Sequence, residues 1–110
     1  MSRSLTDRLL DIQHAIRRAR TFRDALDGAN AEMALSAVLR EIGVIGEAVR
    51  ALPDDVTARQ PHVPWRQIAG MRNFLVHEYF NIDKTVVEDV IANDLEPLAE
   101  VVVPLLAEHG

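Results

Sequence analysis

Apolar residues recur along the chain at alternating spacings of three and four, which is the period of an amphipathic helix. The first stripe predicts a helix that is capped by Ser4 or Thr6 and ends within residues 22–27; it comprises Leu5, Leu9, Ile12, Ile16 and Ala19. The second stripe ends before Pro53 and comprises Leu35, Val38, Ile42, Ile45, Val49 and Leu52. Two long helices are therefore expected in the first half of the chain.

Two glycines interrupt the second predicted helix, Gly43 and Gly46. Glycine in a helix interior costs about 1 kcal/mol relative to alanine. We therefore expect both glycines to lie where another backbone or a buried polar group comes close, in a tight contact between helices.

The pattern changes after Pro53. Residues 56–64 contain Pro61 and Pro64 and are predicted to form a loop rather than a regular helix. A third helix is expected from Trp65 to about Val76, and its inward stripe comprises Ile68, Met71 and Leu75. A turn at residues 81–83 is expected to precede a fourth helix.

The C-terminal region contains two further prolines. Asp94 can cap a new helix, which places Pro97 in a first turn where its missing N–H costs little, whereas Pro104 predicts a kink or a fray. No repeat or convincing strand is present. The sequence therefore predicts an all-α fold, a four- to five-helix up-and-down bundle that forms one domain over residues 1–110.

Composition narrows the class of protein. The chain has no cysteine, which excludes a disulfide framework, an iron–sulfur site and a thiolate nucleophile, and fits a reducing cytoplasm. Residues 1–13 are charged and amphipathic without an apolar export segment, and no stretch is long enough to span a membrane. We therefore expect a cytoplasmic protein with no membrane partner.

Charge is unevenly distributed along the chain. The net charge of −5 argues against a general nucleic-acid coat protein, yet residues 56–77 hold three arginines, two histidines and no acid. A second basic cluster comprises Arg17, Arg18, Arg20 and Arg23. A local cationic face on an acidic protein could bind an anionic substrate; solvated helix faces are an equally good interpretation of the N-terminal cluster.

One motif stands out near the end of the third predicted helix. Arg72, His77 and Tyr79 have the spacing R-x-x-x-x-H-x-Y, and Asn73 directly follows the arginine. This motif resembles the signature of the HEPN superfamily, and in particular its HepT-like branch. The surrounding residues at 64–71, the run from Ile45 to Ala48 and the chain length also resemble HepT-like proteins, so the resemblance covers essentially the whole chain.

The residue types suit metal-independent RNA cleavage, which needs a base, an acid and a cation beside the phosphate. His77 can act as base or acid because histidine titrates near neutral pH. Arg72 presents a permanently charged fork to phosphate oxygens, and Asn73 could bind the phosphate or hold the imidazole. No metal or cofactor is expected, since the four histidines show no ligand spacing.

Helical geometry restricts how this site can assemble. On one straight helix His77 would lie about 140° around the axis from Arg72, so the two could not converge on one phosphate. Two solutions remain open: the helix ends before His77, or two subunits contribute to one site. The HEPN resemblance implies a symmetric homodimer with facing motifs, in which each subunit supplies one histidine as base or acid.

The resemblance also implies a means of control. In HepT-like proteins the tyrosine of the motif accepts AMP from a cognate minimal nucleotidyltransferase, which acts as the antitoxin of a type VII-like toxin–antitoxin pair. Tyr79 is the matching residue here, and a phosphodiester beside Arg72 would neutralise the cation. The predicted substrate is RNA, either tRNA or mRNA. The alternative is a non-catalytic subunit that binds nucleotide or substrate for the nucleotidyltransferase.

Each motif residue also has an ordinary structural interpretation. Arg72 could pair with Glu47 or Glu78, and His77 or Tyr79 could simply pack at the surface. Trp65 and Phe80 are expected in core or dimer packing rather than in base stacking, because the protein has few aromatic residues. The combination of motif and resemblance favours the functional interpretation of Arg72 and His77.

Overall fold

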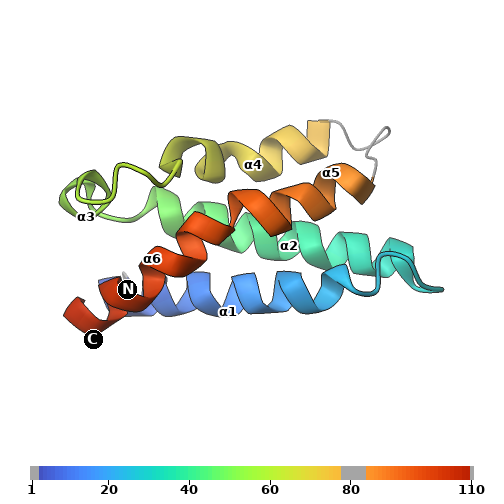
Figure 1. Cartoon of the computed structure of the whole chain (residues 1–110), viewed down its shortest axis with the longest axis horizontal. Coiled ribbons are helices and arrows are strands. Elements are labelled where there is room, and N and C mark those ends of the chain that lie inside the picture. Colours follow the sequence, from blue (N-terminus) through green and yellow to red (C-terminus); the bar gives the residue numbers. More distant parts are fainter. Residues whose placement is uncertain (1–2, 78–83, 110) are drawn as a thin grey trace.

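The computed structural model describes residues 3–77 and 84–109, which form an all-α bundle with no strand in either range (Figure 1). The helices are α1 (Leu5–Arg23), α2 (Ala31–Arg50), α3 (Asp54–Ala58), α4 (Trp65–His77), α5 (Lys84–Asp89) and α6 (Glu96–His109), and a π-helical segment, Val90–Asp94, joins α5 to α6. The all-α class is confirmed. Four long rods, the last of them built from α5, the π segment and α6, agree with the predicted bundle; the homodimer stays a prediction.

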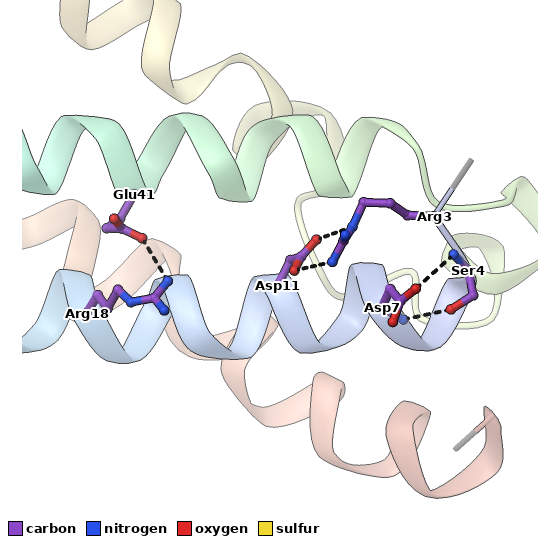
Figure 2. Close-up of polar contacts among 6 residues, drawn as sticks. All are labelled: Arg3, Ser4, Asp7, Asp11, Arg18 and Glu41. Atoms are coloured by element: carbon purple, nitrogen blue, oxygen red, sulfur yellow. Dashed lines mark hydrogen bonds and ion pairs between the residues drawn. The ribbon is translucent and has the colours of Figure 1, made fainter. Parts of the chain in front are cut away.

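The first helix begins at the expected residue. The backbone N–H of Asp7 donates to the Ser4 hydroxyl over 3.1 Å, and the Ser4 backbone N–H donates to the Asp7 carboxylate over 3.4 Å (Figure 2). Such a capping box satisfies helix N–H groups that have no partner within the helix. Thr6, the other candidate cap, instead donates to the carbonyl of His109 over 2.8 Å, which ties α1 to the end of α6.

The segment after α2 departs from its prediction. Residues 54–58 form the short helix α3, so the expectation of a loop from residue 56 was wrong at its start. Pro53 precedes this helix with an extended backbone, and Asp54 and Asp55 occupy its first turn, where carboxylates interact favourably with the helix dipole. The Trp65 indole N–H then donates to the carbonyls of Thr57 and Gln60, over 3.1 and 3.0 Å, which fixes α3 against the start of α4.

The C-terminal rod is continuous but irregular. The N–H of Leu95 bonds the carbonyl of Val90 over 3.1 Å, an i to i+5 bond that defines the π segment. The predicted break near Asp94 therefore takes this form, and Pro97 lies in the first turn of α6 as expected. α6 runs through the exposed Pro104 to His109, so the chain does not fray at that proline.

The core draws on every long rod. Its fully buried large side chains, each less than 2% exposed, include Leu9, Ile12, Ile42, Ile45, Ile68, Leu75, Ile91, Leu95, Leu98 and Leu105. In Figure 1, α2 lies between α1 and α4, antiparallel to both, and the α5–α6 rod packs across them. No helix in the described part of the chain is long and apolar enough to cross a membrane.

Candidate functional site

Arg72 lies across the surface of α2. A β-carbon added to Gly43 would lie 2.7 Å from Cδ and 3.0 Å from Nε of Arg72, so the arginine side chain occupies the space that a larger residue at position 43 would fill. The Arg72 side chain is exposed and forms no hydrogen bond or ion pair with any residue that the structure describes. Glu47, one of its two expected partners, pairs with Arg50 instead, over 3.2 Å.

Gly46 brings the two helices together one turn further along α2. A β-carbon there would lie 3.1 Å from the carbonyl oxygen of Ala69 in α4, and Arg50 donates to the same oxygen over 3.0 Å. The prediction that Gly43 and Gly46 mark a close helix contact is therefore confirmed. The close approach fixes α4 against α2 and so sets the position of Arg72.

An open groove of about 960 Å³ runs along the exposed side of α2, next to Arg72. Its floor is α2, one wall is α1 and the other is α4, which contributes Arg72. The lining residues are Arg3, Arg8, Asp11, Ser36, Leu39, Arg40, Gly43, Val44, Glu47, Ala48, Ala51 and Arg72. We call this feature the α2 groove.

The α2 groove carries a surplus of positive charge on an acidic protein. Four of its lining residues are arginines and two are acids. Both acids are paired: Asp11 binds Arg3 through two hydrogen bonds of 2.8 and 2.7 Å (Figure 2), and Glu47 binds Arg50. Arg8 and Arg72 have no ion-pair partner in the described part of the chain. An anion that entered the groove would meet two arginines that no acid neutralises.

A buried carboxylate, that of Glu41, binds Arg40 of the groove. Glu41 of α2 is only 2% exposed, and its side chain reaches toward α1 (Figure 2). Its Oε2 accepts a 3.0 Å hydrogen bond from Arg40, and its Oε1 lies 3.6 Å from Nη1 of Arg18, close enough for an ion pair but without a hydrogen bond. Both arginine side chains remain largely exposed, so Glu41 holds two positively charged side chains at the surface.

His77 is the last residue of α4, so the helix does not end before it. The first of the two solutions for assembling the site is therefore wrong, and the backbone position of His77 lies about 140° around the α4 axis from Arg72. Asn73 is exposed and lies one turn before His77, nearly on the same face. Tyr79, Glu78 and Phe80 lie outside the described residues.

The face of α4 that carries Asn73 is open to solvent. Phe74 is 61% exposed, and a β-carbon at Gly70 would meet nothing within 4 Å. On a helix, positions 70, 73, 74 and 77 form one continuous strip. The α4 strip, defined by these four positions, therefore combines a large exposed aromatic side chain with the backbone position of the motif histidine.

The other predicted basic residues do not join Arg72. Arg66 lies on an exposed part of α4 and Arg59 at the end of α3, and neither lines the α2 groove. Within the N-terminal cluster, Arg18 pairs with Glu41 and Arg20 with Glu96, the latter over 2.7 Å. The three arginines of residues 56–77 therefore do not gather in the α2 groove, which only Arg72 among them lines.

Sequence reasoning overlooked Arg3, Arg8 and Arg40, which line the groove. The available signal was the polar side of the second apolar stripe, where Ser36, Arg40 and Glu47 recur around Gly43 at helical spacing. Among the residues that the structure describes, no three histidines, aspartates or glutamates are grouped as a metal site would require.

Comparison with known proteins supplies the family. The HepT-like family model, described as ribonuclease HepT-like, matches residues 12–105. This range contains all of α4 and all groove-lining residues except the three at the N-terminal end, Arg3, Arg8 and Asp11. The chain belongs to the HepT-like ribonuclease family. The resemblance inferred from the Arg72 motif is thus confirmed.

Three relatives illustrate the match. "Probable ribonuclease HepT" of Thermococcus cleftensis is 39% identical over 101 residues, which cover 82% of this chain and 89% of that protein. "Putative RNase MJ0127" of Methanocaldococcus jannaschii is 39% identical over 70 residues, 60% of this chain and 58% of its own length. "Putative RNase MJ0125" of the same organism is 49% identical over 47 residues, 43% of this chain and 40% of its own length. The chain thus spans about half of these two archaeal relatives. No solved structure gave a significant match.

Proposed function

We propose that this HepT-like protein is a metal-independent endoribonuclease that acts as a cytoplasmic homodimer and is the toxin of a type VII-like toxin–antitoxin pair. The observation that carries the proposal is the exposed guanidinium group of Arg72, which is unpaired within the described part of the chain. Its guanidinium group is exposed, has no acidic partner among the described residues and borders a cationic groove, on the helix that ends at His77.

The chemistry follows from the three motif residues that lie on α4, namely Arg72, Asn73 and His77. One His77 takes the proton of a 2′-hydroxyl, the 2′-oxygen attacks the adjacent phosphorus, and the bond to the 5′-oxygen breaks as a second His77 protonates it. The products are a 2′,3′-cyclic phosphate and a free 5′-hydroxyl. Arg72 stabilises the charge that builds on the phosphate oxygens, and Asn73 orients the phosphate or the imidazole.

A dimer is proposed because one subunit does not bring the motif together. Arg72 faces α2, whereas the backbone of His77 belongs to the α4 strip on another side of the helix. Packing of two copies through the α4 strip would bury Phe74 and bring the two His77 positions to one interface. Burial of an aromatic side chain of this size favours association by about 2 kcal/mol.

The dimer can be tested by mixing active and inactive subunits. Arg72→Ala and His77→Ala are each expected to abolish cleavage of RNA in EDTA while the fold, followed by circular dichroism, is kept. If one site needs His77 from both subunits, subunit exchange with an excess of His77→Ala removes most of the activity of the wild-type protein, because each mixed dimer holds a single histidine. Activity that follows only the number of wild-type subunits would contradict the shared site.

The same assay separates the proposal from the alternative of a non-catalytic binding subunit. Cleavage by the wild-type protein in EDTA that is lost in His77→Ala excludes the binding subunit. Absence of cleavage of any tRNA or mRNA by the unmodified dimer would overturn the ribonuclease proposal and leave nucleotide or RNA binding for a partner as the function.

Control by a partner is the second part of the proposal. We infer that a minimal nucleotidyltransferase transfers AMP to Tyr79, so that the new phosphodiester occupies the anion site beside Arg72. Mass spectrometry of protein co-expressed with such an enzyme should show added AMP on Tyr79, and the modified protein should no longer cleave RNA. An unmodified Tyr79 in inhibited protein would remove this switch.

A further inference from the structure

The α2 groove extends well beyond the one arginine that the proposed reaction uses. Arg8 of α1 and Arg40 of α2 line it together with Arg72 of α4, so three helices each contribute a cation to one depression. Its volume, about 960 Å³, is far larger than a single phosphate group requires. The additional arginines therefore call for a ligand that carries several negative charges.

We propose that the α2 groove binds the single-stranded RNA that flanks the cleaved bond, and that Arg40 and Arg8 bind phosphates other than the one at Arg72. The inference rests on the proposed ribonuclease function and adds to it the path of the substrate. Arg40 and Arg8 are binding residues in this scheme, and cleavage itself remains with the residues of α4.

Arg40 is well prepared for this role. Its side chain is 75% exposed, yet one guanidinium nitrogen is fixed by a 3.0 Å hydrogen bond to the buried carboxylate of Glu41. An arginine has five N–H donors, so most of them remain free to bind phosphate oxygens. A side chain that is already held in place loses less conformational entropy when a ligand binds.

The direction of the groove also fits. α2 and α4 are antiparallel: position 46 of α2 faces position 69 of α4, and position 43 faces position 72. Arg40 comes three residues before Gly43, about 4.5 Å along the α2 axis, and so lies toward the end of α4 that carries His77. A strand that passes Arg40 would thus approach the cleavage site from the side of His77.

The groove lining favours a nucleic-acid backbone over a protein partner. Its floor includes Gly43, Ala48 and Ala51, which leave room for a ribose-phosphate chain, and its two acids are already paired. No aromatic residue lines it, so contacts would be to phosphates and largely independent of base sequence. The competing occupant is an acidic protein segment, including that of a second copy of this chain.

The experiment measures binding of an RNA that cannot be cleaved. A fluorescein-labelled 12-nucleotide 2′-O-methyl RNA lacks the attacking hydroxyl and can be titrated with dimeric protein by anisotropy at several salt concentrations. Arg40→Gln is compared with Arg66→Gln, which removes the same charge from a part of α4 outside the groove. We expect Arg40→Gln to weaken binding on the order of 3- to 10-fold and to reduce the salt slope by about 0.7, as for one lost phosphate contact to a single strand.

Equal effects of Arg40→Gln and Arg66→Gln would overturn the inference, because only the net charge would then matter. Binding that is unchanged in both variants, or a change in dimerisation without a change in RNA affinity, would overturn it as well; the latter result would assign the groove to a protein contact. Because Arg40→Gln also removes a partner of Glu41, Arg8→Gln serves as a second variant in the same groove and is expected to weaken binding similarly.

A minimal substrate distinguishes this inference from the proposed function. A dinucleotide contains only the cleaved phosphate, so its cleavage by Arg40→Gln should match the wild-type rate, while cleavage of a 12-nucleotide RNA falls. Equal loss on both substrates would place Arg40 in the catalytic site instead of on the path and so contradict the inference. If no RNA is cleaved at all, the proposed function fails, whereas the binding comparison still decides whether the groove holds RNA.

Discussion

The absence of a side chain at Gly43 determines where Arg72 lies. A β-carbon at position 43 would approach Cδ of Arg72 to 2.7 Å, a distance that real β-carbons do not adopt. The Arg72 side chain therefore adopts this conformation against α2 only while residue 43 is glycine. Glycine at position 43 costs helix stability, and it makes room for Arg72, the cation of the proposed reaction.

Replacement of Gly43 by alanine should separate stability from activity. Alanine adds up to about 1 kcal/mol of helix propensity, so the melting temperature should be unchanged or higher. The added methyl group displaces the Arg72 side chain, and we expect cleavage in EDTA to fall at least on the order of 10-fold, as for other losses of a charge-stabilising contact.

Gly70→Ala is the matched control for this prediction. It also replaces a helical glycine, but its β-carbon would meet nothing within 4 Å, and Arg72 should not move. Gly70→Ala is therefore expected to raise the melting temperature; because position 70 belongs to the α4 strip, its cleavage is compared with wild type only after sedimentation has shown that the variant is dimeric. Full activity of Gly43→Ala would show that the position of Arg72 over α2 is not required.

Gly46→Ala should act on the fold rather than on Arg72 directly. Its β-carbon would lie 3.1 Å from the backbone carbonyl of Ala69, which cannot rotate away as a side chain can. The two helices must separate, and the free energy of unfolding in urea should fall by about 1–3 kcal/mol, as in other overpacked contacts. A variant as stable as wild type would mean that α2 and α4 adjust freely.

Removing the acid and removing its two arginine partners should change the free energy of unfolding by different amounts in the cluster around Glu41. Glu41→Gln removes a buried charge and leaves only exposed arginines behind, so the free energy of unfolding should change by less than about 1 kcal/mol. The double change Arg18→Gln with Arg40→Gln instead leaves a carboxylate buried without a cation, and should cost about 1–3 kcal/mol after allowance for solvent screening. Chemical denaturation measures both, and the reverse order would contradict this account of the cluster.

Phe74→Glu tests the proposed dimer face. A carboxylate at a buried contact is strongly unfavourable, so this variant should sediment as a folded monomer and lose cleavage. Val103→Glu is the control, because Val103 is similarly exposed, 60% against 61%, but lies on α6 away from the α4 strip. If both variants remain dimeric, the proposed contact through the α4 strip is wrong.

The helices could be predicted from sequence because apolar spacing and local capping determine them. Ser4 marks the start of the first helix, Pro53 the stop of the second and Pro97 the first turn of the last, all through interactions within one or two turns, and the structure agrees at each. The short helix α3 was missed because two prolines further along dominated the interpretation of residues 56–64. The π segment was expected only as a break, since its i to i+5 bonds leave no distinct pattern of residues.

The candidate site was only partly accessible to sequence reasoning. The motif identified Arg72, Asn73 and His77 because their spacing is local, and the cost of glycine in a helix identified Gly43 as a point of close contact. The partner at that contact, Arg72, and the grouping of Arg8 and Arg40 with it depend on how three helices pack. Such packing joins residues 29 or more positions apart, which a local pattern does not encode.

The π segment between α5 and α6 absorbs one residue of the chain. A π turn holds one residue more than an α turn, so deletion of one exposed residue of the segment, such as Ala92, would restore a regular helix and leave α5 and α6 with nearly the same faces toward the core. A deletion within α6 has no such turn to absorb it and would rotate the buried residues on one side of it, among them Leu98 or Leu105, by about 100°. A one-residue deletion should therefore be tolerated at residues 90–94 far better than within α6.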